Sequence, residues 1–127
     1  MRFLGIDYGK KRVGLAVSDE KGCIAFPYDT LTNNKDLVNN IISVCENEGI
    51  EVVVIGESKM LSGKDNPVTK DIEIFKDRLQ NVVDLPIHME PEFFTTQEAK
   101  RFQGKNKHTD SSAATFILQR FLERKGV

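Results

Sequence analysis

Four acidic residues fall where the sequence pattern predicts that a strand or a helix begins or ends. Asp7 closes an apolar run near the N-terminus, and Asp110 begins the last predicted helix. Glu90 and Glu92 lie at and just after the end of the last predicted strand. Carboxylates that converge in one crevice repel one another unless a cation lies between them, and Mg²⁺ or Mn²⁺ suits oxygen ligands of this kind. Two such ions can stabilise both the attacking and the leaving oxygen of a phosphodiester, so the acids indicate phosphodiester chemistry.

Each acid also has an ordinary structural interpretation. Asp7 precedes Tyr8 and Gly9 and could simply start a turn. Asp110, considered alone, is better explained as a helix N-cap. Glu92 follows a proline and could be a solvated loop residue. The metal site is therefore favoured by the combination of acids and not by any one of them.

Two groups of cations lie beside these acids in the sequence: Lys10, Lys11, Arg12, Lys105 and Lys107. Cations in a turn are most often solvated, and they also keep a sheet edge from aggregating. Beside a metal site, the same cations would hold phosphates and set the register of a nucleic acid. The formal net charge of −1 counts against a simple nucleic-acid-binding domain. It does not exclude one, because acids gathered at a metal site lower the sum.

The length of 127 residues fits one domain spanning residues 1–127, with a core that needs no disulfide. No apolar run has the length of a membrane span, and the N-terminus does not have the pattern of a signal peptide. Cys23 and Cys45 lie far apart without metal-ligand spacing, so we expect two buried thiols. Such a chain is expected in the reducing cytoplasm.

The elements that must position the acids alternate between strands and helices after an initial meander. The predicted strands span residues 2–7, 13–19, 23–31, 51–56 and 85–90. Helical spacing of apolar residues predicts helices over 36–48, from 67 to about 79, after a capping box at 95–98, and from Asp110 onward. This order predicts an α/β fold in which helices flank a five-stranded mixed sheet. The carboxyl ends of strand 2–7 and of the later strands can then converge on one crevice.

Several segments resemble the YqgF family of RuvC-like nucleases, which have the ribonuclease H-like fold. The opening "LGIDYGKKRVGLAVSD" is similar to the N-terminal motif of that family, whose acid falls on Asp7. "EPEFFTT" resembles its Asp-Glu-Arg-x-Thr-Thr segment, with the metal-binding glutamate at Glu92. "DSSAATFILQRFL" resembles its C-terminal motif, with the acid at Asp110. The resemblance covers nearly the whole chain.

This resemblance implies a magnesium-dependent nuclease in which Asp7, Glu92 and Asp110 are the catalytic metal ligands. Family members are linked to maturation of the 5′ end of the 16S ribosomal RNA precursor, so precursor RNA and ribosomal precursor particles are the expected partners. A Holliday junction resolvase-like activity on branched DNA is the alternative.

Two departures from the family pattern leave a third interpretation open. The Gly-Leu-Pro loop of the family is Gly56-Glu57-Ser58 here. The Asp-Glu-Arg of the family is Pro91-Glu92-Phe93. The missing arginine removes a bidentate phosphate contact, and Glu57 adds a negative charge near the expected path of the phosphates. The chain could therefore be a nucleic-acid-binding module for ribosome assembly in which catalysis is weak or lost.

Overall fold

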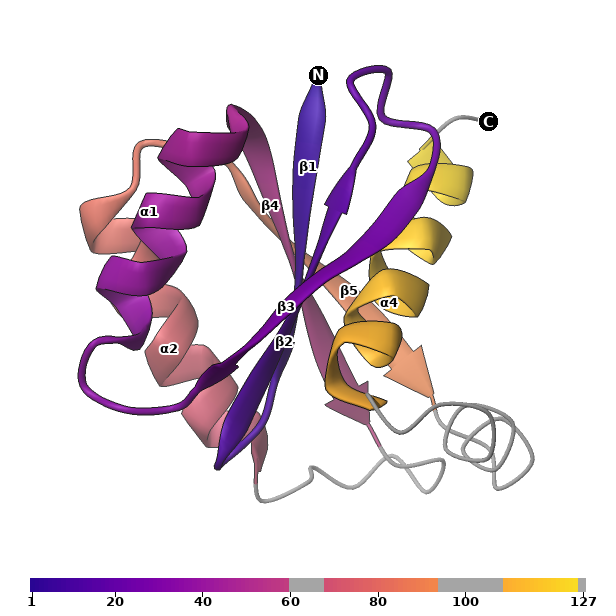
Figure 1. The fold of residues 1–127 in the computed structure, drawn as a ribbon. Coiled ribbons are helices and arrows are strands. Elements are labelled where there is room, and N and C mark those ends of the chain that lie inside the picture. Colours follow the sequence, from indigo (N-terminus) through magenta and orange to yellow (C-terminus); the bar gives the residue numbers. More distant parts are fainter. Residues whose placement is uncertain (60–67, 94–108, 126–127) are drawn as a thin grey trace.

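The computed structural model describes residues 1–59, 68–93 and 109–125, which form a central sheet between two layers of helices (Figure 1). The strands are β1 (Arg2–Tyr8), β2 (Arg12–Ser18), β3 (Ala25–Thr32), β4 (Ile50–Lys59) and β5 (Ile87–Phe93). The helices are α1 (Leu37–Glu48), α2 (Val68–Val82) and α4 (Thr109–Lys125). The predicted mixed sheet of five strands is confirmed, in the order β3-β2-β1-β4-β5. The helix predicted after residue 95 lies outside the described residues.

Strand direction brings three carboxyl ends to one edge of the sheet. β1, β2 and β3 pair antiparallel, as the predicted meander requires. β1 pairs parallel with β4, and β4 pairs parallel with β5. β1, β4 and β5 therefore all end at the lower edge of the sheet in the view of Figure 1, which we call the carboxyl edge.

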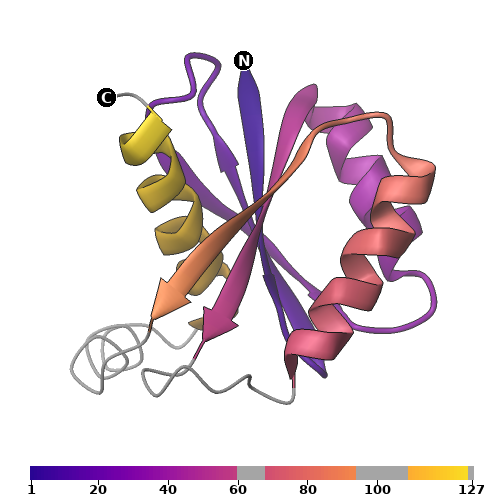
Figure 2. The ribbon, with the colours of Figure 1, turned by 180° about the vertical axis from the view of Figure 1, so that it is seen from behind.

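Side chains alternate between the two faces of the sheet along β1. Leu4 and Ile6 enter the core beneath α1 and α2, which lie together on one face. Phe3 belongs to a second core beneath α4, which covers the other face (Figure 2). The predicted separation of even from odd positions in this strand is confirmed, and Asp7 continues the α4 face.

Two glycines allow α4 to lie close to the sheet. A Cβ atom on Gly5 would lie 2.7 Å from Leu118 Cβ and 3.1 Å from the Ala114 carbonyl oxygen. A Cβ atom on Gly56 would collide with Ile117 Cδ1. The strands beneath α4 therefore present bare backbone where the helix passes over them.

β4 and β5 extend further than their apolar runs predict. They remain paired beyond Gly56 and Glu90, as far as Lys59 and Phe93. Pro91 is tolerated because β5 is an edge strand, where a missing N–H donor need not leave a neighbouring strand unpaired. Glu92 consequently lies within the strand, two positions after Glu90, and the expectation that it follows the strand was wrong.

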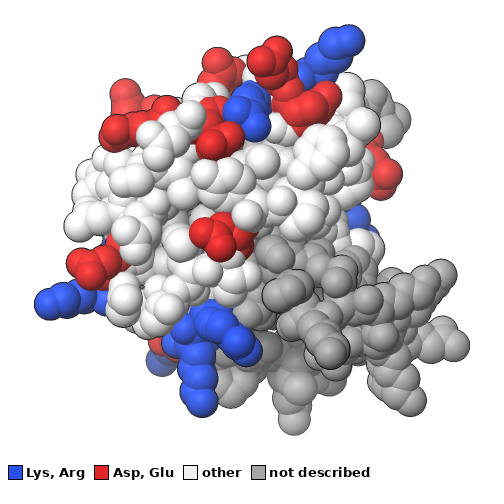
Figure 3. Space-filling model, viewed as in Figure 1, with Lys and Arg blue, Asp and Glu red and all other residues white. Residues whose placement is uncertain are grey.

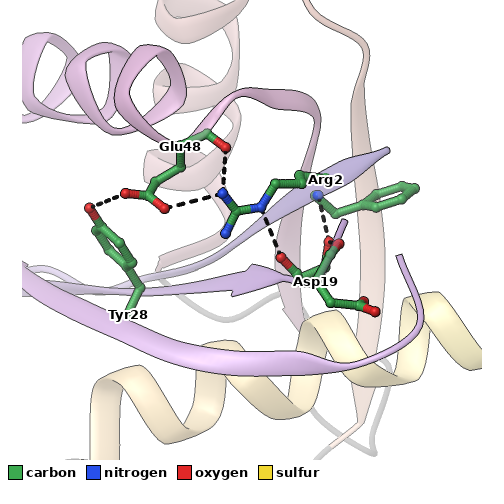
Figure 4. Close-up of polar contacts among 6 residues, drawn as sticks. Arg2, Asp19, Tyr28 and Glu48 are labelled. Carbon is green, nitrogen blue, oxygen red and sulfur yellow. Dashed lines mark hydrogen bonds and ion pairs between the residues drawn. The ribbon is translucent and has the colours of Figure 1, made fainter. Parts of the chain in front are cut away.

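The opposite end of the sheet is fastened by Arg2, near the start of β1 (Figure 4). Its Nη1 donates to the Glu48 carbonyl oxygen at 2.7 Å and contacts the Glu48 carboxylate at 3.3 Å. Its Nε donates to the Ser18 carbonyl oxygen at 3.2 Å, and the Tyr28 hydroxyl donates to Glu48 at 3.2 Å. Burial and then the charge of Glu48 raise the pKa of Tyr28. This network ties the end of α1 to three strands, far from the carboxyl edge.

The two cysteines differ in their surroundings. Cys45 is buried in α1, as expected, and its burial raises the pKa of the thiol to about 11. Cys23 is exposed, so the expectation of a second buried thiol was wrong. The physical reason is that β3 begins only at Ala25, which leaves Cys23 in the polar turn after β2. No helix among the described residues has the length and apolar character needed to cross a membrane.

Candidate active site at the carboxyl edge of the sheet

Asp7 lies one residue before the end of β1, opposite Gly14 of β2. Its side chain is half-buried and belongs to the α4 face of the sheet, like Phe3 two positions earlier. Because β1 is the central strand, neighbours on both sides fix its backbone. β1 therefore presents this carboxylate at the carboxyl edge from a rigid position.

The packing of α4 on β1 shows where the helix begins relative to Asp7. Phe121 packs on Phe3 with ring centroids 6.0 Å apart, and Ala114 lies over Gly5. Moving along β1 toward its end thus corresponds to moving back along α4 toward its N-terminus. Asp110 is one helical turn before Ala114, a step of about 6 Å, which matches the two-residue step from Gly5 to Asp7. The backbone position of Asp110 therefore falls at the carboxyl edge, on the α4 face.

Glu92 occupies a register position on the same face. It pairs with Ser58 of β4, two positions after Glu90. His88 and Glu90, the earlier residues of the same alternation, both contact α4. The backbone positions of Asp7, Glu92 and Asp110 thus share one face and one edge.

The side chains of Glu92 and Asp110 lie outside the described part of the structure. Among the side chains that it does describe, no three His, Cys, Asp or Glu residues form a group that could hold a metal ion. The proposed trio of ligands is therefore an expectation from the sequence and the backbone register. Its donor chemistry, three carboxylates, fits a hard divalent cation.

Glu90, the fourth acid of the sequence pattern, has a structural role. Its side chain is only 2% exposed and forms an ion pair with Arg124 of α4. A buried carboxylate requires such a partner because the charge has lost its hydration. The pair connects the edge strand β5 to α4.

The predicted basic cluster lies in the turn between β1 and β2. Lys10, Lys11 and Arg12 are exposed there. Blue side chains gather at the lower edge of the molecule in Figure 3, where this turn lies in the same view of the ribbon. The structure thus brings the three cations to the edge where Asp7 ends its strand. Lys105 and Lys107 lie outside the described residues.

Asn33 holds this turn in place, a role that the sequence pattern did not reveal. Its backbone N–H donates to the Lys11 carbonyl oxygen at 2.9 Å. Its Nδ2 donates to the Gly9 carbonyl oxygen at 2.7 Å. The only signal in the sequence is a pair of asparagines after a strand, which is typical of many loops.

The sequence pattern also did not single out Arg120 and Arg124 of α4. With Glu90, Phe116 and Glu123 they line an open hollow of about 590 Å³ between α4 and β5. The Arg120 guanidinium lies over the Phe116 ring, 5.5 Å from its centroid. Spacing of three and four residues along α4 places these side chains on one face, and this is the signal that could have identified them.

Glu57 lies on the other face of the sheet from Asp7. It lies two positions after Ile55 and four after Val53, so it shares the face of these two residues, which belong to the core beneath α1 and α2. Glu57 therefore does not place a negative charge beside Asp7, on the expected path of the phosphates. The departure from the family pattern at Glu57 leaves the α4 face unchanged in charge.

Comparisons with known proteins agree with this architecture. The family model described as "RuvX: Holliday junction resolvase" matches residues 1–124. A protein of Maridesulfovibrio salexigens called "Putative pre-16S rRNA nuclease" is 37% identical over 98% of this chain and 99% of its own length. A protein of the same name from Dictyoglomus turgidum is 37% identical over 97% of this chain and 94% of its own length.

Solved structures share the fold at low sequence identity. Thermus thermophilus RuvC superposes with a TM-score of 0.62 at 13% identity, over 99% of this chain and 97% of that one. The fowlpox virus Holliday junction resolvase gives a TM-score of 0.57 at 12% identity, over the full length of both chains. The RuvC-like, ribonuclease H-like fold is thereby confirmed, and with it the family that the motifs indicated: the chain belongs to the RuvX family, also called YqgF.

Proposed function

We propose that this chain is a metal-dependent nuclease that hydrolyses phosphodiester bonds at the carboxyl edge of its sheet. The observation that carries the proposal is the register of α4 on β1, in which Ala114 lies over Gly5. From it follows that the first turn of α4 and the end of β1 share one edge. The proposed ligands of the metal, Asp7, Glu92 and Asp110, come from three different elements that meet at this edge.

Each group of residues has a separate task in this proposal. A divalent ion such as Mg²⁺ or Mn²⁺, when bound, supplies Lewis-acid stabilisation of charge on phosphate oxygens. The three carboxylates hold it, and the central position of β1 restrains the backbone at Asp7. Lys10, Lys11 and Arg12 contact neighbouring phosphates and hold the strand beside the acids.

We propose the precursor of 16S ribosomal RNA as the substrate, with cleavage that matures its 5′ end. Support comes from the name of the relatives that are 37% identical over nearly the whole chain. The protein would then act on free precursor RNA or on ribosomal precursor particles. A four-way DNA junction is the second candidate, which the description of the family model favours.

The test compares the wild type with Asp7→Asn on three labelled substrates: the 5′ region of precursor 16S RNA, a single-stranded RNA and a four-way DNA junction. Each is incubated with Mg²⁺, with Mn²⁺ or with a chelator. We expect metal-dependent cleavage by the wild type and at least about a hundredfold less by Asp7→Asn, because one ligand has lost its charge. Asp29→Asn is the matched control, because it makes the same change in the edge strand β3.

The pattern of cleavage decides among the candidates. Cleavage of RNA alone supports the precursor substrate, and cleavage of the junction alone supports the resolvase activity. Binding without cleavage of any substrate, at any metal concentration, would contradict the nuclease and support an assembly module. Equal loss of activity in Asp29→Asn would show that the effect of Asp7→Asn is not specific to the proposed site.

A further inference from the structure

A pocket with an apolar inner wall and a polar rim opens on the face of the sheet opposite Asp7. It has a volume of about 80 Å³ and lies between the end of β1, the β3–α1 connection, α1 and α2. A cavity needs about 10–15 Å³ by this measure to hold one water molecule. The pocket is several times larger than that, so it has room for a small flat group such as one planar base.

The inner wall of this pocket is aromatic and apolar. The rings of Tyr8 and Phe75 lie 4.9 Å apart at an interplanar angle of 31°. Tyr8 is half-buried and Phe75 is only 4% exposed, so the walls are held by the core. Ile74 lies at the mouth with 58% of its surface exposed. Phe75 supports the Tyr8 ring from the core side, and a partly exposed aromatic ring such as that of Tyr8 can stack on the flat face of any nucleobase.

The rim of the pocket is polar and carries more positive than negative charge. Lys35 and Arg78 are exposed cations, and Asp71 is the one acid of the lining. In the part of the chain that the structure describes, neither Lys35 nor Arg78 forms an ion pair. Asn33 also lines the pocket, with its amide orientation fixed by the bond to Gly9. Cations at the rim of an apolar pocket suit the phosphates on either side of an inserted base.

The position of Tyr8 connects this pocket to the candidate active site. Tyr8 directly follows Asp7, so their Cα atoms are about 3.8 Å apart while their side chains face opposite sides of the sheet. The turn of Lys10, Lys11 and Arg12 lies between the two faces and is anchored by Asn33, a lining residue. A strand that follows the basic turn around the carboxyl edge would reach both sites.

We propose that this pocket binds one unpaired base of the substrate strand, while Lys35 and Arg78 contact the flanking phosphates. The inference rests on the proposed function for the kind of ligand, and it adds that the bound segment is single-stranded beyond the cleavage site. A paired base cannot enter without leaving its helix, and unstacking and unpairing it oppose binding. The pocket therefore selects unpaired RNA over duplex.

The test measures binding in the presence of a chelator, by fluorescence anisotropy, so that cleavage plays no part. The probes are a labelled single-stranded RNA of about twelve nucleotides, a duplex of the same sequence, and a strand of the same length made of abasic units. Ile74→Glu places a carboxylate at the mouth of the pocket. Val82→Glu is its matched control, because Val82 is 57% exposed on the same helix and does not line the pocket.

We expect Ile74→Glu to bind the single-stranded RNA about tenfold more weakly than Val82→Glu binds it. We also expect the wild type to bind the abasic strand about tenfold more weakly than the intact single strand. Neither substitution removes a buried group, so both variants should fold. Equal affinities of the two variants for the single strand, or tighter wild-type binding of the duplex, would overturn the pocket. If Ile74→Glu weakens binding as expected but the wild type cleaves nothing with metal, the pocket stands and the nuclease fails.

Discussion

Gly5→Ala is the substitution that tests most directly how the fold holds the candidate site together. The added methyl group would lie 2.7 Å from Leu118 Cβ, whereas carbon atoms in contact prefer about 3.5–4.0 Å. Leu118 Cβ is attached to the helix backbone, so no rotation of the Leu118 side chain can move it away. The clash can be relieved only if α4 moves outward by roughly 1 Å.

Overpacking of this kind costs about 1–3 kcal/mol of the free energy of unfolding. We expect Gly5→Ala to fall in the upper half of this range, because the Ala114 carbonyl oxygen also lies within 3.1 Å of the new methyl group. Asp110 belongs to the same helix and would move with it. Metal–ligand distances tolerate only about 0.2 Å, so an outward shift of α4 should reduce nuclease activity even in molecules that remain folded.

The assay combines urea unfolding with metal-dependent cleavage at a temperature where every variant is folded. Gly49→Ala provides the control, because Gly49 has a φ of 62° with no atom within 4 Å of the added methyl group. It should cost about 1 kcal/mol through backbone strain and leave the activity of the folded protein intact, since α4 is untouched. Unchanged stability of Gly5→Ala would refute the close packing. Lost stability with full activity would refute the role of α4 in positioning a ligand.

Three further outcomes follow from the structure. The exposed Cys23 should react with a thiol reagent at neutral pH in the native protein. Cys45, which is buried and has a pKa of about 11, should react only after unfolding. Comparable reaction rates of the two thiols in the native protein would contradict this prediction. Arg124→Leu should destabilise the protein by about 2 kcal/mol in urea unfolding because it leaves the Glu90 carboxylate buried and unpaired, and the double change to leucines should cost less than the single one. Asp19 accepts hydrogen bonds from the backbone N–H groups of Ile24 and Cys23, and these bonds lower its pKa below 3.8. The stability difference between the wild type and Asp19→Asn should therefore persist above about pH 4 and vanish as the pH falls below the folded pKa of Asp19. A pH-independent difference would contradict this prediction.

The β1–β2 hairpin shows how much of this fold local sequence can predict. Alternation along residues 2–7 was sufficient to assign Phe3 and Gly5 to one face and Leu4 and Ile6 to the other. A face determined in this way also determines the face of Asp7, because side chains in a strand repeat every two residues. The shared edge of the strands followed in turn from their predicted order.

Contacts between residues distant in sequence could not be predicted in this way. The extension of β5 through Pro91 depends on its place at the edge of the sheet, which no local pattern reveals. The partner of Glu90 is Arg124 on the last helix, and it is fixed only when α4 docks on the sheet. Asn33 supports the basic turn from a loop that ordinary turn preferences explain equally well. Each of these features was missed because its physical cause lies in tertiary packing.

The separation of acidic and basic side chains at the carboxyl edge explains how a chain with a net charge of −1 can bind a nucleic acid. The acids assigned to the metal are on the α4 face. Glu57, which the sequence placed near the phosphates beside Asp7, lies on the other face. The exposed cations of the β1–β2 turn lie between the two faces, where a strand would cross. Attraction between charges weakens over about 10 Å at ordinary ionic strength, so local arrangement outweighs the sum. The near-neutral composition, which counted against a nucleic-acid-binding protein, is therefore compatible with one that carries three exposed cations together at the carboxyl edge.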